Sequence, residues 1–470
     1  MSAPAQHFLR SAAEKSADLV HRQIIRKGID SYDIAVGRGH NRFHDYEAAR
    51  QRCYEIKREA VNNLERYLLE FEEKVLARGG HVFWAADAEE ARNYVADLAT
   101  KRGVKKVVKS KSMVTEEIHL AGALEKVGIE VVETDLGEFI VQLRNEPPYH
   151  IVTPAMHLNR AQIAKLFADK LEDIGTDDPQ KLVALARKHL RRQFFSAEMG
   201  ISGANFLVAD AGMIALNTNE GNGRLCTSLP RIHVAMTGIE KVIPRLQDLA
   251  TLWPVLATAG TGQHITTYST LIGGPRQPGE VDGPEEFHVV LVDNGRTELL
   301  ADPEQRDVLH CIRCGACLNA CPVYRTVGGH TYATTYPGPI GSVLTPHLRG
   351  LSEFQHLSYA SSLCGACTSV CPVKIDLHHH LLHNRRNAIA ARTHPLAEKV
   401  GFAFWRWMML DEGRFSRLGA LAKAGGRLFG KLGLTGSALD PMRPWTRSHS
   451  ALPLPRESFR SLWRKRNGTH

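Results

Sequence analysis

Two cysteine-rich stretches, which begin fifty residues apart, restrict the possible structure of this chain more than any other feature. The first reads CIRCGACLNACP from Cys311 to Pro322, and the second reads SSLCGACTSVCP from Ser361 to Pro372. The first copy has four cysteines in the spacing C-x2-C-x2-C-x3-C-P, which is typical of bacterial ferredoxins. The second copy has three, because Ser361 stands where the repeat predicts a fourth. The repeat predicts two iron–sulfur clusters.

The repeat also predicts how the ligands are shared. In such repeats the three closely spaced cysteines bind one cluster, and the fourth reaches the other cluster. We therefore assign cluster 1 to Cys311, Cys314, Cys317 and Cys371, and cluster 2 to Cys321, Cys364 and Cys367. We expect a [4Fe–4S] centre in both places. With only three cysteines, however, the second centre is either completed by Ser361 or water, or is a [3Fe–4S] centre.

A zinc site is the main alternative for these cysteines. Four-cysteine zinc sites use two C-x2-C pairs that are separated by a longer gap. Here the first four cysteines are packed into one short run, and the pattern then repeats together with its proline. The spacing favours iron–sulfur clusters over zinc. The segment 323–360 between the copies is too long for a small β-type ferredoxin, so we expect an all-helical ferredoxin module over residues 301–390.

The 300 residues before this module predict an α/β domain. With 470 residues the chain is long enough for two or three domains. We expect one long helix over 41–78, and then alternating short apolar runs and amphipathic helices from 81 onward, with Asp87 capping a helix. Strand patterns dominate 201–300, after helical patterns over 161–171 and 178–195. Such alternation is typical of a parallel or mixed sheet covered by helices.

The last eighty residues, 391–470, differ in composition. The net charge of the whole chain is +9, yet the residues from Arg385 to the end sum to +12. We expect a basic C-terminal extension with short helices and without a nucleic-acid partner. Its segment FAFWRWMML, residues 402–410, favours packing on the module or a partner over contact with a membrane surface. The chain shows no signal peptide and no apolar run of about 18 residues, which predicts a cytoplasmic protein, free or at the inner face of the membrane.

Two loops of the α/β domain carry candidate polar groups. In VVKSKSMVTEEI, residues 107–118, Thr115 is either a helix cap or part of an anion site with Ser110, Ser112, Lys109 and Lys111. In DAGMIALNTNEGNGRL, residues 210–225, Glu220 is a candidate base and Arg224 a candidate carboxylate clamp. The alternative there is a Gly/Asn hairpin turn.

A third loop, residues 260–276, adds further candidates for a 2-hydroxy acid site. Such a site needs a cation for the carboxylate and a group that takes the hydroxyl proton. His119, Arg224, His264 and Arg276 meet this need only if they converge. The catalytic residues therefore stay unassigned, with Glu220, Arg224 and His264 as candidates. No G-x-G-x-x-G follows a predicted strand, so the sequence lacks a dinucleotide fingerprint.

The chain resembles the lactate utilization protein B family. The resemblance rests on CIRCGACLNACPVYRTVGGHTY, on YASSLCGACTSVCPVKIDLHHHL, and on upstream segments such as GISGANFLVADAGMIALNTNEGNGR. It covers nearly the whole chain, and the missing eighth cysteine is part of the family pattern. It implies an α/β domain similar to sugar-isomerase and CoA-transferase folds, and the seven cysteines as cluster ligands. It assigns no catalytic residue.

The resemblance implies an iron–sulfur subunit of an NAD-independent L-lactate dehydrogenase complex that oxidises L-lactate to pyruvate. Two partner subunits and an electron acceptor linked to the respiratory chain are expected with it. Whether lactate is oxidised in this α/β domain or in a partner stays open, so the chain is not assigned as an enzyme by itself. The alternatives are oxidation of another 2-hydroxy acid such as glycolate, and a non-catalytic electron-transfer or scaffold subunit.

Overall fold

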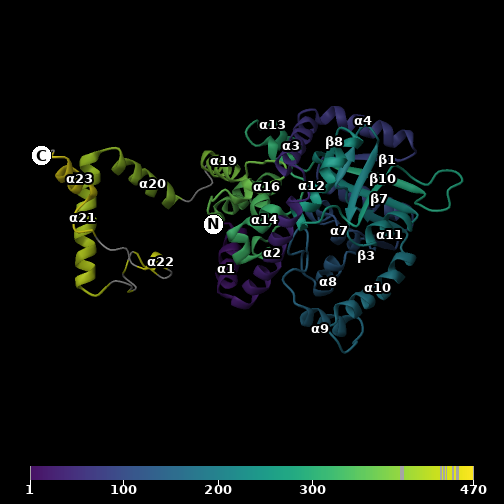
Figure 1. The fold of residues 1–470 in the computed structure, drawn as a ribbon, viewed down its shortest axis with the longest axis horizontal. Helices are drawn as coiled ribbons and strands as arrows, with labels where there is room; N and C mark the ends of the chain where they lie inside the picture. The colour runs from purple at the N-terminus through teal and green to yellow at the C-terminus, as the bar shows by residue number, and fades with distance from the viewer. Residues whose placement is uncertain are drawn as a thin grey trace. The chain divides into compact units, whose positions relative to one another are not determined.

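A computed structural model describes residues 2–391, 396–434, 437, 440, 442–446, 449–450 and 455–468 (Figure 1). The chain divides into two compact units, residues 1–392 and 393–470. The expected α/β domain and the expected cysteine module both lie in the first unit. The predicted boundary between them, and the third segment 391–470, therefore remain predictions about folding units.

A six-stranded parallel sheet forms the centre of the α/β domain. Its strand order is β1-β10-β7-β4-β2-β3, and every neighbouring pair runs parallel. The central strand β7 is buried over its whole length, as expected for a parallel strand covered on both faces. The strands are β1 (His81–Ala85), β2 (Lys106–Lys109), β3 (Glu130–Glu133), β4 (Met199–Ser202), β7 (Ile232–Gly238) and β10 (Glu286–Val292). The predicted parallel α/β architecture is confirmed.

A smaller mixed sheet adjoins the first. Its order is β8-β5-β6-β9, with β5 antiparallel to β6 and parallel to β8. Its strands are β5 (Phe206–Val208), β6 (Met213–Thr218), β8 (Val242–Ile243) and β9 (Tyr268–Ile272). All the strands expected between 201 and 300 are present, and they are divided between the two sheets.

Helices cover both faces of the large sheet because its strands alternate between two cores. Along β10, Val290 and Val292 belong to the core beneath α5–α7, while Val289 and Leu291 belong to the core beneath α4. Helices α8–α10 cover the end of the sheet at β2 and β3. These helices are α3 (Tyr46–Asn62), α4 (Leu64–Ala77), α5 (Ala88–Lys101), α6 (Met113–Glu117), α7 (Leu120–Lys126), α8 (Leu136–Arg144), α9 (Arg160–Lys170) and α10 (Pro179–Ser196).

The structure tests four local predictions. The long helix over 41–78 is two helices, because the backbone of Asn63 leaves helical geometry between α3 and α4. Asp87 caps α5 as predicted, by accepting two backbone N–H groups. Thr115 is not a helix cap, because Ser112 precedes the helix and accepts the N–H of Thr115. The segment expected as a hairpin turn continues instead into helix α11 (Asn222–Ser228).

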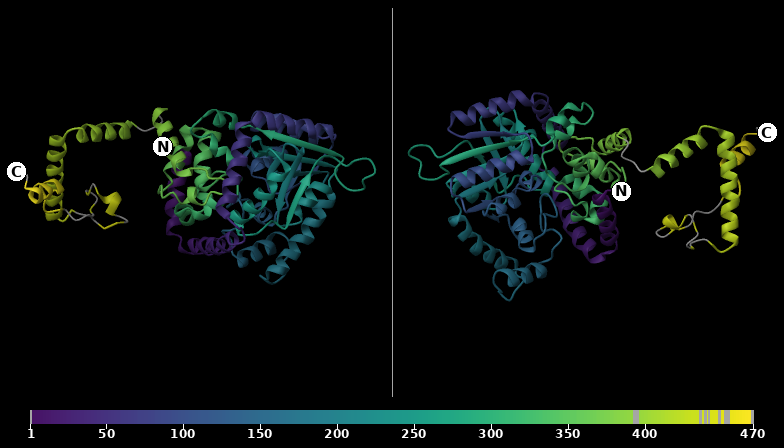
Figure 2. Two further views of the ribbon diagram at one scale, coloured as in Figure 1. Left: turned by 45° about the horizontal axis from the view of Figure 1, so that its top comes forward. Right: turned by 180° about the vertical axis from the view of Figure 1, so that it is seen from behind.

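The cysteine module is helical, as predicted, and the N-terminal helices pack against it. Helix α1 (Ala3–Ala17) contacts α15 and α17, and α2 (Leu19–His40) contacts α12, α14 and α15 (Figure 2). One continuous hydrophobic core joins these helices, the small sheet and the cysteine loops. The remaining elements of the first unit are α12 (Leu249–Thr261), α13 (Arg296–Ala301), α14 (Ala316–Ala320), α15 (Pro322–Val327), α16 (Gly338–Arg349), α17 (Leu351–Phe354), α18 (Ala366–Ser369), α19 (Leu377–Ala390), and the 3₁₀ turns η1 (Ile239–Lys241), η2 (Leu246–Asp248), η3 (Arg306–His310), η4 (His330–Tyr332) and η5 (Gln355–Tyr359).

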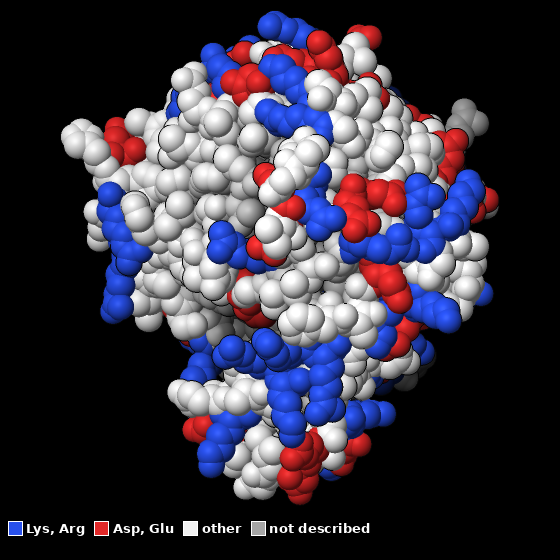
Figure 3. Space-filling model, turned by 90° about the vertical axis from the view of Figure 1, so that its right-hand side faces the viewer, with Lys and Arg blue, Asp and Glu red and all other residues white. Residues whose placement is uncertain are grey.

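Charged side chains lie on the outer helices. Helix α10 exposes Arg187, Lys188, Arg191 and Arg192, and Figure 3 shows Lys and Arg gathered over the lower part of the face at that end. Elsewhere on this face both signs of charge are mixed. The α10 group is a solvated face of an amphipathic helix, because its other side packs Leu182, Leu185 and Phe194 into the core.

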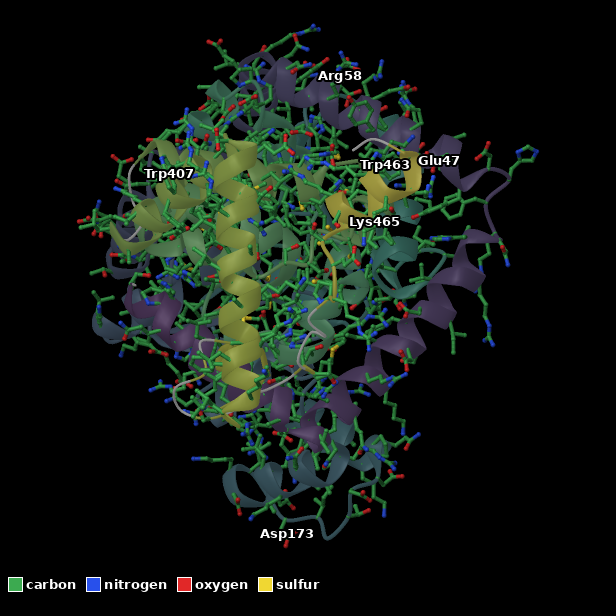
Figure 4. All side chains as sticks on the ribbon, turned by 90° about the vertical axis from the view of Figure 1, so that its left-hand side faces the viewer. Glu47, Arg58, Asp173, Trp407, Trp463 and Lys465 are labelled. Atoms are coloured by element: carbon green, nitrogen blue, oxygen red, sulfur yellow. The ribbon has the colours of Figure 1, made fainter. Side chains whose placement is uncertain are left out.

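The second unit consists of helices with little buried surface. They are α20 (Leu396–Met409), α21 (Glu412–Lys431), α22 (Arg443–Thr446) and α23 (Phe459–Asn467), and the described residues of α20 and α21 include none that is buried. Trp407 on α20 and Trp463 on α23 are each about half exposed (Figure 4). Among the described helices, none has the combined length and hydropathy needed to cross a bilayer.

Candidate iron–sulfur site and an adjoining cavity

The two cysteine loops have the same backbone conformation. Arg313 (φ 60°) and Gly315 (φ 80°) in the first copy correspond to Leu363 (φ 54°) and Gly365 (φ 78°) in the second. Each loop leads into a short helix, α14 or α18, that carries the third cysteine position. A non-glycine residue with positive φ is uncommon, so its occurrence at the same place in both copies indicates a constrained ligand loop.

Ser361 occupies the structural position of Cys311. The N–H of Arg313 donates to Cys311 Sγ at 3.4 Å, and the N–H of Leu363 donates to Ser361 Oγ at 3.0 Å. The second loop therefore keeps the ligand geometry of the first and replaces only the sulfur by an oxygen.

The last cysteine of each copy is held by the chain that follows it. Cys321 Sγ accepts the N–H of Tyr324 at 3.5 Å, and Cys371 Sγ accepts the N–H of Ile375 at 3.3 Å. Arg50 on α3 donates to the carbonyl oxygen of Cys371 at 2.8 Å and so anchors the second loop. Backbone donors at sulfur stabilise the thiolate form that binds metal.

Electrostatic contacts divide the seven cysteines into two sets that cross the repeat. Burial raises the pKa of Cys371 to about 12, and the thiol of Cys311, from the other copy, adds to the shift. Burial raises the pKa of Cys314 and of Cys317 in the same way, and Cys311 and Cys371 add to both shifts. Burial also raises the pKa of Cys367 to about 11, with Cys321 of the first copy as the largest charged contributor. These neighbours agree with the sets expected from the spacing, and the assignment of ligands to each cluster stays a prediction.

The sulfur spacing does not fit a mononuclear zinc site. A tetrahedral zinc with Zn–S bonds of about 2.3 Å places its sulfurs roughly 3.8 Å apart. Among the described residues, groups of three ligand atoms within 4.8 Å of one another occur at Glu146, His157 and His330 and at Asp376, His378 and His379, and neither includes a cysteine. More widely spaced sulfurs suit the larger iron–sulfur group, whose irons would hold the cysteines as thiolates.

The two sets differ in exposure. Cys311, Cys317 and Cys371 are buried, whereas Cys364 in the other set is exposed. The N–H of Ala366 lowers the pKa of Cys364, so this thiol ionises more readily than the buried ones. The second set therefore reaches the surface at Cys364, while in the first set only Cys314 is partly exposed.

A cavity of about 790 Å³ opens between the α/β domain and the first cysteine loop. It is lined by the start of α6, the start of α8, the end of β6, and α12, and on the other side by Arg313, Cys314 and Tyr336. Its volume lies in the range of small-molecule sites. The cavity therefore borders directly on a predicted ligand of cluster 1.

A buried ion network fixes Arg313 at this border. Glu240 accepts Arg296 Nε at 2.6 Å and Arg313 Nη2 at 3.2 Å, and Glu117 accepts the other end of Arg296 at 2.8 Å. Tyr336 donates to Glu117 at 2.6 Å, and its ring lies beneath the Arg313 guanidinium at 4.7 Å. The network joins the carboxyl end of the parallel sheet to the cysteine loop.

Of the catalytic candidates, Glu220 lies in this cavity and the others do not. Its carboxylate accepts the N–H of Leu136 at 3.1 Å, and the loss of hydration there, followed by repulsion from Asp135, raises the pKa of Glu220 to about 7. Arg224 lies over the ring of Tyr268, and His264 is exposed. The cavity lining includes neither.

The remaining candidates are also dispersed. Arg276 pairs with Glu285 at 3.2 Å, His119 is exposed, and Lys109 is buried among three glutamates. Of the expected anion loop, Lys111 and Ser112 line the cavity. Lys241 also lines the cavity, and no motif in the sequence pointed to it. Arg313 could have been found from the sequence, because it stands between two predicted cysteine ligands.

Comparison with known proteins agrees with this arrangement. Residues 68–292 match the family model described as LUD domain, and residues 307–375 match the 4Fe-4S dicluster domain. A parallel α/β domain joined to a dicluster module defines an iron–sulfur protein.

The full-length relatives make the family specific. The chain is 46% identical to lactate utilization protein B of Bacillus cytotoxicus, over 90% of this chain and 89% of that protein. It is 43% identical to lactate utilization protein B of Oceanobacillus iheyensis, over 96% and 97% of the two chains. The chain belongs to the lactate utilization protein B family. A crystal structure of a DUF162 family protein from Deinococcus radiodurans covers 49% of this chain and 98% of its own length, with 14% identity and a TM-score of 0.28, too low to carry a structural argument.

Proposed function

We propose that this chain is the iron–sulfur electron-transfer subunit of an NAD-independent L-lactate dehydrogenase complex that oxidises L-lactate to pyruvate. The observation that carries the proposal is the pair of matching cysteine loops, one with Cys314 at a cavity and the other with Cys364 at the surface. The names of the relatives support the substrate. Two partner subunits and an acceptor linked to the respiratory chain complete the proposed complex.

The proposed ligands are the seven cysteines of the repeat. Cys311, Cys314, Cys317 and Cys371 would hold cluster 1, and Cys321, Cys364 and Cys367 would hold cluster 2. Iron–sulfur clusters supply one-electron oxidation and reduction when bound. Ser361, with its Oγ at the position equivalent to Cys311 Sγ, supports a [4Fe–4S] centre at the second site, and loss of one iron there would give [3Fe–4S].

The chain's own groups set the environment of each site. The N–H donors at Cys311, Cys321 and Cys371 stabilise negative charge on sulfur. Three cysteines of the first set are buried and Cys314 borders the cavity, while the exposed Cys364 leaves the second set open to a partner protein. An inner site beside a ligand cavity and an outer site at the surface are the arrangement that an electron-transfer subunit needs.

The second unit supports contact with other components of the complex. Phe402, Phe404 and Trp405 on α20 are each more than half exposed. A partner subunit, or the inner face of the cytoplasmic membrane, would cover such residues. We also propose that the protein acts in the cytoplasm. The α/β domain is proposed to be similar to sugar-isomerase and CoA-transferase folds.

The test is substrate-dependent reduction of the purified three-subunit complex. L-Lactate, added anaerobically without NAD, should bleach the visible cluster absorbance and produce pyruvate. Glycolate should reduce the clusters at least tenfold more slowly. If glycolate reduced the clusters as fast as L-lactate or faster, lactate would not be the preferred substrate. If L-lactate did not reduce the clusters at all, the proposed role would be refuted.

A further inference from the structure

The inner end of the cavity carries a buried cation whose hydrogen bonds are incomplete. The Arg313 side chain is only 9% exposed. Its Nη2 binds Glu240, but its Nε and Nη1 have no hydrogen-bond partner in the described part of the chain. A buried donor without an acceptor is destabilising, so a ligand that supplied an acceptor would be stabilised here.

A second buried cation lies beside Arg313. Lys241 lines the same cavity and is 6% exposed. Burial, and then repulsion from the nearby Arg313, lower the pKa of Lys241 to about 8. Both cations line the same cavity, and an anion between them would relieve their repulsion.

The carboxylates of the ion network are already engaged. Glu240 is shared between Arg296 and Arg313, and Glu117 accepts from Arg296, Tyr336 and Asn294. These two glutamates balance the two arginines, and Lys241 is a further cation at this end of the cavity. The unpaired Nε–H and Nη1–H of Arg313 point in different directions, and each can donate one hydrogen bond to a carboxylate oxygen.

We propose that this end of the cavity binds the carboxylate of a small 2-hydroxy or 2-oxo acid, with Arg313 and Lys241 as its two cationic contacts. The identity of the acid rests on the proposed function, whereas the binding site rests on the cavity and its cations. The volume exceeds what a three-carbon acid fills, so the charge and the free donors select the ligand.

The position of Arg313 ties this site to the first cysteine set. Arg313 stands between Cys311 and Cys314, and Cys314 itself lines the cavity. A carboxylate bound to the guanidinium therefore changes the electrostatic surroundings of two predicted ligands. Binding should be visible in the EPR spectrum of the cluster they hold, without any turnover.

The experiment uses the anaerobically purified, cluster-loaded full chain without its partners. Titration calorimetry with L-lactate and pyruvate should give saturable binding. Lactamide, in which a neutral amide replaces the carboxylate, should bind at least tenfold more weakly. L-Lactate should also shift the EPR spectrum of the dithionite-reduced protein. Binding of lactamide or of inorganic phosphate as tight as that of L-lactate would overturn the assignment.

Variants test the two cations separately. Arg313→Gln and Lys241→Met should each weaken binding of L-lactate at least tenfold, and Arg313→Lys should restore part of it. Arg224→Gln is the matched control, because Arg224 lies in the same domain outside the cavity lining. This variant should bind L-lactate as tightly as the natural protein. If Arg313→Gln loses iron, Lys241→Met decides, since Lys241 lies outside the cysteine loops. Unchanged binding in an iron-replete Arg313→Gln, or in Lys241→Met, would refute the site.

The outcomes separate this inference from the proposed function. A chain that is reduced in the complex but binds no carboxylate alone keeps its electron-transfer role and loses this site. A chain that binds the acid at Arg313 but is never reduced keeps the site and loses the proposed role. If Arg313→Gln shifts the cluster spectrum while carboxylate affinity stays the same, the arginine serves the cluster only, and the inference is wrong.

Discussion

Charged side chains line the cavity, and burial raises the pKa of one of them, Glu220, toward neutrality. Its carboxyl lies by Asp135 and Leu136 at the cavity wall, with a pKa raised to about 7, while Lys111, Lys241 and Arg313 supply positive charge to the same space. Since Glu220 remains exposed over part of its surface, solvent screening places the midpoint at or below this value.

We therefore predict a pH dependence of carboxylate binding. A raised pKa means that Glu220 is neutral below its midpoint and adds a negative charge above it. The affinity for L-lactate should fall several-fold as the pH rises from about 5 to about 7.5, where Lys241 still holds its proton. Calorimetry of Glu220→Gln should show a flat profile over this range. A profile that is the same in both proteins would exclude Glu220 from the site.

Ser361 allows a second prediction at this scale. Because its Oγ accepts the same loop N–H that Cys311 Sγ accepts, Ser361→Cys should supply the missing sulfur at the second site. Mild oxidation should then produce less of the three-iron EPR signal than in the natural protein. Ser196→Cys, exposed at the end of α10 and outside both cysteine loops, is the control and should behave like the natural protein. No difference between the two variants would contradict the assigned register.

At the scale of the elements, α12 packs closely against the first cysteine loop. A Cβ built on Gly260 of α12 would lie 2.8 Å from the carbonyl oxygen of Cys314, too near for any side chain. This contact holds the loop against the cavity wall, which α12 also lines.

Gly260→Ala should displace the loop at Cys314. We expect a loss of stability of about 1–3 kcal/mol, as for other overpacked sites, together with fewer irons per chain. Gly122→Ala in α7, where the added Cβ meets nothing, should be neutral or gain about 0.5–1 kcal/mol. Thermal unfolding and iron analysis check both variants. Full iron content and an unshifted melting temperature in Gly260→Ala would show that the loop tolerates the change.

The elements also show what sequence patterns can and cannot predict. Short strands such as His81–Ala85, and the ligand loops, were predictable because their signals are local. The pairing of α1 and α2 with the cysteine module was not, because it joins segments some 300 residues apart. The placement of Arg313 and Lys241 in one cavity was not predictable either, because it depends on how the sheet edge and the cysteine loop pack. Arg224 and His264 had suitable chemistry, but their loops point elsewhere.

At the scale of the whole molecule, the two units have different degrees of packing. The first contains the continuous core that includes the cysteines, whereas α20 and α21 bury none of their described residues. A chain that ends at Ala391 should therefore keep its iron and its melting temperature. Anaerobic iron analysis and calorimetry would check this, with the full chain as reference. Aggregation or loss of iron in the shortened chain would show that the basic segment is part of the cluster-binding fold.

The central claim is that each iron–sulfur site draws ligands from both copies of the repeat. EPR and iron counts of anaerobically purified Cys371→Ser and Cys321→Ser measure this directly, against a natural protein expected to hold about seven or eight irons. Cys371→Ser should lose the signal of the site at Cys311, Cys314 and Cys317 and keep the other, and Cys321→Ser should do the reverse. If Cys371→Ser instead disturbs only the site at Cys364 and Cys367, or if the natural protein is colourless and contains zinc, the account is wrong.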